Sequence, residues 1–116
     1  MDEKIAIFAF NGETMYFAHA LLNVLDMKGK GYDVKLIIEG SATRQIKELS
    51  EPDKPFAKIY GKVKEAGLID CVCQACSTQT GSLESAKEQG LPLCKEMSGH
   101  PSIARYIEAG YQVLVF

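Results

Sequence analysis

The chain has 116 residues, of which 47% are hydrophobic and 24% are charged, and its formal net charge is −2. This length suits one globular domain with its own core, and the composition excludes a disordered chain, a collagen and a low-complexity protein. The mildly acidic balance, without clusters of Lys and Arg, argues against nucleic acid as a partner.

No apolar run reaches the roughly 18 residues that cross a membrane, and residues 1–4 (MDEK) do not resemble a signal peptide. We therefore expect a cytoplasmic protein that does not bind membranes. In a reducing compartment the cysteines are expected to be reactive, metal-bound or buried rather than joined in disulfides. They are Cys71, Cys73, Cys76 and Cys94.

Short apolar runs alternate with segments whose apolar residues repeat every three or four positions. The runs predict strands over residues 4–10, 33–38, 68–73, 91–96 and 111–116. The repeats predict five helices: over about residues 14–27, around Ile46 and Leu49, from Phe56 to about Gly67, around Leu83 and Ala86, and after Pro101. In the last of these helices, Ile103 and Ile107 are expected to face the core.

Because no tight hairpin signal separates the strands, we expect one α/β domain over residues 1–116. Its architecture is predicted to be a three-layer α/β/α fold with a five-stranded, mainly parallel sheet. Ligands of such sheets bind outside the carboxyl ends of the strands. Asn11, Gly12 and His100 lie in loops at that edge and are candidates for a substrate pocket, although a turn explains Asn11 and Gly12, and a helix start or the surface explains His100.

Three of the four cysteines lie where the third predicted strand ends. Because side chains alternate along a strand, Cys71 and Cys73 should share one face. Cys73 is nearest the carboxyl end, and Cys76 falls in the following loop or first helical turn. The free N–H groups of a helix start favour a thiolate, so we expect Cys73, or both Cys73 and Cys76, to be nucleophilic near neutral pH. Cys76 is either a resolving thiol or incidental, and Cys71 and Cys94 are expected to be buried packing residues.

The chain resembles the DsrE-like proteins of bacterial and archaeal sulfur relays, which include DsrE, DsrF and TusD. The resemblance rests on the opening strand and long first helix, KIAIFAF then TMYFAHALLNVL, and on the cysteine that precedes the glycine-bearing stretch Cys73 to Gly81. It implies a persulfide on Cys73 and assembly into homo- or hetero-oligomers. The chain departs from the family where basic residues are frequent, at Ser77 to Thr80, and in the added thiol of Cys76.

Our hypothesis is a sulfur carrier of the sulfurtransferase type, which takes sulfane sulfur from a donor protein and passes it to an acceptor thiol without a cofactor. Whether it is an enzyme stays open. The alternatives are a thiol–disulfide redox protein using Cys73 and Cys76, and an oligomeric binding module with inert thiols. The cysteine spacing matches zinc knuckles poorly, so no metal is expected. Candidate contacts within a homo-oligomer, which core packing explains equally well, are Tyr60, Tyr106, Tyr111 and Phe116.

Overall fold

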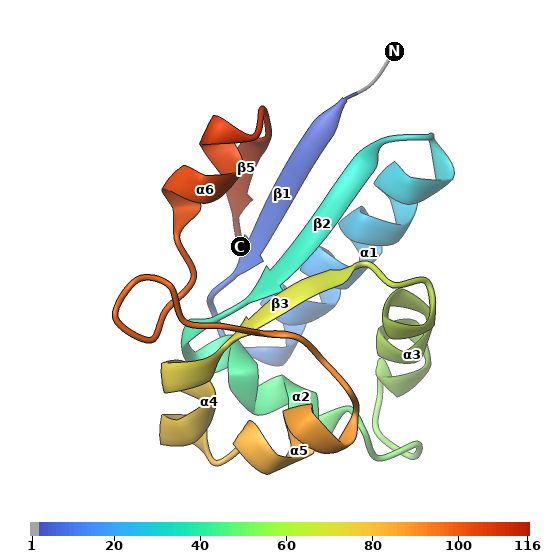
Figure 1. Ribbon diagram of the computed structural model, residues 1–116. Coiled ribbons are helices and arrows are strands. Elements are labelled where there is room, and N and C mark those ends of the chain that lie inside the picture. Colours follow the sequence, from blue (N-terminus) through green and yellow to red (C-terminus); the bar gives the residue numbers. More distant parts are fainter. Residues whose placement is uncertain (1–2) are drawn as a thin grey trace.

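The computed structural model describes residues 3–116 and contains one sheet of five strands in the order β4-β3-β2-β1-β5 (Figure 1). All pairings between these strands are parallel, which confirms the α/β fold with a parallel sheet. The strands are β1 (Lys4–Ala9), β2 (Asp33–Ile38), β3 (Ile69–Cys73), β4 (Leu93–Cys94) and β5 (Gln112–Val115).

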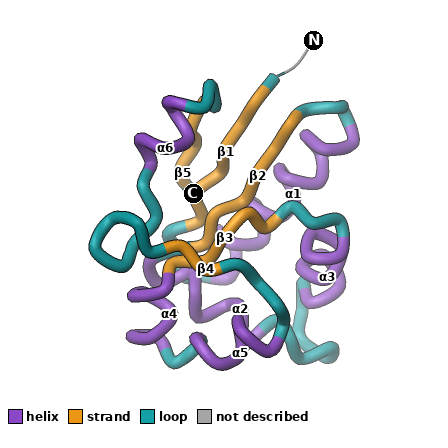
Figure 2. Tube along the Cα trace, in the orientation of Figure 1, coloured by secondary structure: helices purple, strands orange, loops and turns teal. Residues whose placement is uncertain are grey.

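Helices cover both faces of this sheet (Figure 2). They are α1 (Thr14–Gly29), the 3-10 helix η1 (Gly40–Thr43), α2 (Arg44–Glu48), α3 (Ala57–Glu65), α4 (Gln74–Thr80), α5 (Leu83–Glu88) and α6 (Ile103–Glu108). None of the helices in residues 3–116 is both long and apolar enough to cross a membrane.

Two cores of unequal size hold the layers together. The larger core packs the sheet against α1, α2, α3 and α5, with Phe17, Ile46 and Tyr60 among its fully buried members. The smaller core packs the opposite face against α6, and it includes Phe8 and Tyr106. Continuous burial on both faces explains why β1 reads as an unbroken apolar run instead of an alternating one.

Helix α6 turns a different face to the sheet from the one predicted. Ile103 and Ile107 are 40% and 58% exposed, whereas Tyr106 is 2% exposed. The tyrosine ring fills the smaller core edge-on to Phe8, with ring centroids 5.4 Å apart. A large aromatic ring buries more apolar area than either isoleucine, so it decides the rotation of this six-residue helix.

For the three tyrosines that were candidate subunit contacts, the structure supports the alternative of core packing. Tyr60, Tyr106 and Tyr111 are all buried in the cores, and Phe116 is partly buried. The fourth strand is also shorter than predicted, with two residues in place of residues 91–96. Pro92 has no N–H to donate, and it joins the sheet only through its carbonyl, which accepts from Val72 at 2.8 Å.

Candidate functional site

Strand β3 positions its cysteines with the help of a β-bulge. The register against β2 shifts at Asp70, which is the extra residue. Beyond the bulge the side chains alternate, with Val72 in the larger core and Cys71 in the smaller one. Cys73 therefore follows Cys71 on the α6 side and comes last, at the carboxyl end of the strand.

Helix α4 begins directly after Cys73, which is its N-cap residue. The Cys73 Sγ accepts a hydrogen bond from the backbone N–H of Cys76 at 3.3 Å, as an Asp or Ser oxygen usually does at this position. The spacing of three residues places Cys76 in the first turn, beside the cap. The far end of α4 is fixed by Thr80, whose hydroxyl shares a 2.8 Å hydrogen bond with Thr43 of η1.

His100 reaches the cysteines from a tight turn that follows β4. Met97 and His100 exchange two backbone hydrogen bonds, and Ser98 and Gly99 between them have φ values of 51° and 93°. Two left-handed residues in a two-residue turn favour glycine, which has no Cβ to clash. The Gly99 carbonyl accepts from the N–H of Ala75 at 3.0 Å, so the turn is tied to the start of α4.

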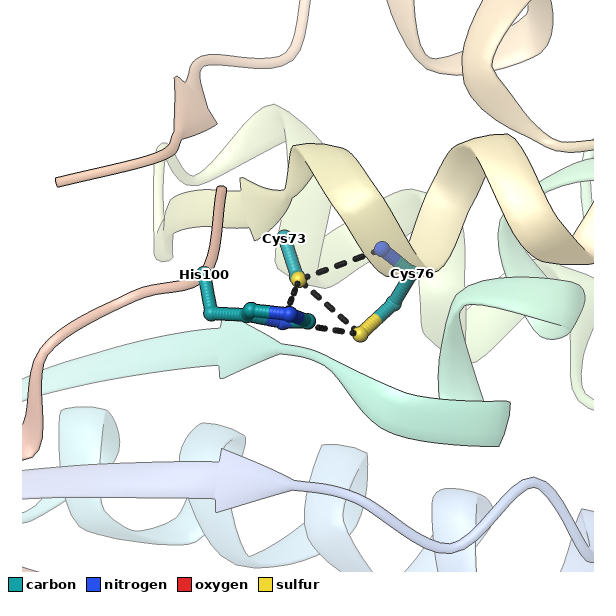
Figure 3. A group of neighbouring side chains, drawn as sticks. All are labelled: Cys73, Cys76 and His100. Atoms are coloured by element: carbon teal, nitrogen blue, oxygen red, sulfur yellow. Dashed lines mark hydrogen bonds between the residues drawn. The ribbon is translucent and has the colours of Figure 1, made fainter. Parts of the chain in front are cut away.

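Cys73, Cys76 and His100 point toward one another (Figure 3). The Cys73 thiol donates to the Cys76 sulfur at 2.9 Å. The His100 Nδ1 lies 3.2 Å from the Cys73 Sγ and 3.6 Å from the Cys76 Sγ. Two thiols and an imidazole so arranged can move a proton, form or break a sulfur–sulfur bond, or bind a soft metal ion.

The two thiols differ in burial. Cys73 is fully buried, at 0% exposure, while Cys76 is half-buried. Burial, together with the hydrogen bond to Cys76, raises the pKa of the Cys73 thiol to about 12, although the Cys76 backbone N–H acts in the opposite direction. The prediction of a readily ionised Cys73 is therefore wrong, because desolvation outweighs the helix N–H groups. A reagent from solvent meets Cys76 first.

A carboxyl group that the sequence pattern did not single out, Glu39, also faces the site. It directly follows β2 and is half-buried. Burial raises the pKa of Glu39, and the nearby His100 acts against that rise. The charge of Glu39 in turn contributes to the raised pKa of Cys73. Its place immediately after a parallel strand is the signal that could have identified it.

Asn11 and Gly12 lie at the end of β1 and form a turn. The Asn11 Oδ1 accepts from the N–H of Glu13, and the Gly12 N–H donates to the Ser41 Oγ, both at 2.8 Å. The Gln45 side chain donates to the Gly12 carbonyl, also at 2.8 Å. A Cβ on Gly12 would collide with the Ser41 carbonyl, so close backbone approach requires glycine here. A role of either residue in a substrate pocket stays a prediction.

The other two cysteines, Cys71 and Cys94, form a disulfide between β3 and β4. The expectation that the cysteines are unbridged is therefore wrong for this pair. They are 23 positions apart, and only the pairing of the two strands brings their Cα atoms to 5.6 Å. Arg105 and Tyr106 of α6 lie against this disulfide, with the Arg105 Nη2 3.7 Å and the Tyr106 hydroxyl 3.5 Å from the Cys71 Sγ.

Comparison with known proteins gives relatives without an assigned activity. No protein-family model matches the chain. It is 33% identical over 96 residues to the uncharacterized protein MJ0733 of Methanocaldococcus jannaschii, which covers 83% of this chain and 76% of that protein. Two uncharacterized proteins of Archaeoglobus fulgidus match shorter stretches. One is 58% identical over 36 residues, which cover 31% of this chain and 97% of that protein. The other is 49% identical over 43 residues, which cover 37% of this chain and 70% of that protein.

Proposed function

The chain belongs to the same family as the uncharacterized protein MJ0733 of Methanocaldococcus jannaschii, and from its cysteine site we propose that it is a sulfur-transfer protein. In this proposal Cys76 attacks the sulfane sulfur of a donor, and Cys73 is the second thiol of the reaction. The observation that carries the proposal is the 2.9 Å separation of the two sulfurs beside the His100 ring.

The transfer begins at the more exposed thiol, Cys76. Its proton passes to the His100 Nδ1, which lies 3.6 Å away. The thiolate attacks the terminal sulfur of a donor persulfide, so that a sulfur–sulfur bond forms on Cys76 while the donor's own sulfur–sulfur bond breaks. The donor leaves as a thiol, taking the proton held on His100. Cys76 then carries the sulfane sulfur as a persulfide.

The persulfide on Cys76 has two fates. An acceptor thiolate can attack its outer sulfur, which restores the Cys76 thiolate and gives a persulfide on the acceptor. Alternatively, Cys73 passes its proton to the His100 Nδ1, 3.2 Å away, and attacks the inner sulfur. The outer sulfur leaves as hydrosulfide and takes that proton, and a Cys73–Cys76 disulfide forms. In that case the two cysteines lose two electrons and the sulfane sulfur gains them. The short distance between the sulfurs favours the second fate when no acceptor is bound.

The resemblance to DsrE-like proteins supports this proposal, because it assigns the persulfide chemistry to the cysteine at the end of the third strand. The burial of Cys73 moves the carrier role to Cys76, three residues later. Donor and acceptor proteins, a cytoplasmic location and the classification as an enzyme remain predictions of the proposal.

Assembly into a homo-oligomer is also part of the proposal. The tyrosines are buried, so the apolar side chains that support an oligomer are exposed ones on α6 and on the edge strand β5. Edge strands with exposed apolar residues readily pair with another chain. The residues are Ile103, Ile107, Leu114 and Val115, which are between 40% and 63% exposed.

A second candidate function is thiol–disulfide exchange, which the 2.9 Å separation of the Cys73 and Cys76 sulfurs also favours. Here Cys76 attacks the disulfide of a partner and forms a mixed disulfide. Cys73 then attacks the Cys76 sulfur, which releases the reduced partner and closes the Cys73–Cys76 disulfide. The two candidates differ in the bond that Cys76 attacks, which is a sulfane bond in one and a disulfide in the other.

The intact mass of the protein after exposure to inorganic polysulfide tests the proposal. Starting from Cys73 and Cys76 as thiols, we expect the Cys73→Ser variant to gain the mass of sulfur, because its persulfide has no resolving thiol. The wild type should lose the mass of two hydrogen atoms as the disulfide closes. Cys76→Ser should remain unchanged.

A sulfur adduct retained by Cys76→Ser would contradict the assignment of the carrier. A wild type that ignores polysulfide but closes its disulfide with a small organic disulfide would support the second candidate instead. The double variant Cys71→Ala/Cys94→Ala is the matched control, because it removes the other two sulfurs and should react as the wild type does.

A further inference from the structure

Three metal-binding atoms converge at the carboxyl end of β3. They are the Sγ atoms of Cys73 and Cys76 and the Nδ1 of His100, all within 4.8 Å of one another (Figure 3). Each comes from a separate part of the fold: Cys73 ends a strand, Cys76 lies in the first turn of α4, and His100 ends a turn of the following loop.

The distances are close to those of a tetrahedral zinc site. With zinc–sulfur bonds of about 2.3 Å and zinc–nitrogen bonds of about 2.0 Å, neighbouring donors are separated by about 3.8 Å for two sulfurs and about 3.6 Å for sulfur and nitrogen. The sulfur–nitrogen separations here are 3.2 and 3.6 Å, and the two sulfurs are 2.9 Å apart. To receive the ion, the two sulfurs must part by about 0.9 Å, and the Cys73 Sγ must move about 0.4 Å away from the His100 Nδ1. Cys76 and His100 are half-buried and can rotate to allow it.

We infer that Cys73, Cys76 and His100 form a three-donor site for Zn²⁺ whose fourth position is open. Binding releases the two thiol protons to solvent, and the two thiolates then balance the charge of the ion. Thiolate and imidazole donors select zinc over magnesium or calcium, which prefer oxygen ligands. The half-buried carboxyl group of Glu39 lies near His100. An open fourth position is the arrangement of zinc sites that bind a water or a substrate.

The inference does not depend on the proposed function, because it requires only the three donor atoms. The two are nevertheless linked, since the same sulfurs cannot bind zinc and form a disulfide with each other. Zinc is therefore expected to protect Cys76 from polysulfide, and oxidation of the pair is expected to release the ion.

Zinc binding is tested by competition with a chromophoric chelator, using the full chain with Cys73 and Cys76 as thiols. We expect one Zn²⁺ per chain. Cys76→Ser and His100→Ala should each weaken binding by about 100-fold or more, because even residues around a metal's direct ligands contribute about 10- to 100-fold. His19→Ala is the matched control. It removes the chain's other histidine, which is exposed on α1, and it should leave the affinity unchanged.

Cobalt absorption identifies the ligands directly. Co²⁺ added in place of Zn²⁺ should give a sulfur-to-cobalt charge-transfer band in the wild type and in His19→Ala, and the band should weaken in Cys76→Ser. Wild-type protein that binds no Zn²⁺, or His100→Ala that binds it as tightly as the wild type, would overturn the inference. Zinc uptake by a protein that ignores polysulfide and disulfides would leave the site standing and refute the proposed function alone.

Discussion

Replacing Cys76 with serine (Cys76→Ser) is expected to slow the alkylation of the native protein by iodoacetamide about 100-fold. The remaining free thiol, Cys73, is fully buried, and its pKa is raised to about 12. It can react only when the site opens locally, and a 100-fold protection corresponds to about 3 kcal/mol of opening free energy. The rate is measured by mass spectrometry under an excess of reagent.

The reverse variant, Cys73→Ser, should keep a rapidly alkylated thiol. Serine is a good N-cap residue and can accept the hydrogen bond from the N–H of Cys76, so α4 should still form. Equal rates for the wild type and Cys76→Ser would show that Cys73 is the accessible thiol, and the roles assigned to the two cysteines would then be reversed.

The double variant Cys71→Ala/Cys94→Ala is expected to lose about 3 kcal/mol of unfolding free energy, the amount that closing a loop of this size removes from the unfolded chain's entropy. The disulfide joins positions separated by 23 residues. It also holds β4, which pairs with β3 at only two positions. Urea unfolding with and without a reductant measures the change.

Reductant serves as the internal control for this prediction. It should destabilise the wild type by a similar amount and leave the double variant unaffected, because Cys73 and Cys76 are already thiols. A double variant as stable as the oxidised wild type would show that the disulfide does not stabilise the fold.

The sheet and its helices could be predicted from the sequence because they depend on local patterns. The run DVKLII gave β2 its observed bounds, Asp33–Ile38. The orientation of α6 could not be predicted in this way, since it depends on Tyr106 packing against Phe8, nearly a hundred residues away in the chain. Periodicity identifies an apolar face, but a single large ring can decide which face is buried.

The candidate site was predictable in its residues and not in its chemistry. The position of Cys73 at a strand end and its spacing from Cys76 followed from the sequence. The raised pKa of Cys73 could not be predicted from the sequence, because it depends on burial beneath the loop that carries Gly99 and on the hydrogen bond to Cys76. His100 reaches the thiols only through the left-handed turn at Ser98 and Gly99 and its hydrogen bond to Ala75. The Cys71–Cys94 disulfide likewise required the pairing of β3 with β4.

In the proposed reaction Cys76 receives the sulfur and Cys73 resolves it. Fragmentation mass spectrometry of the Cys73→Ser variant, alkylated and digested after exposure to polysulfide, identifies the residue that carries the added sulfur. We expect the adduct on Cys76, with Cys71 and Cys94 still joined. An adduct on Cys71 or Cys94, or a Cys76 without added sulfur, would show that Cys76 is not the carrier.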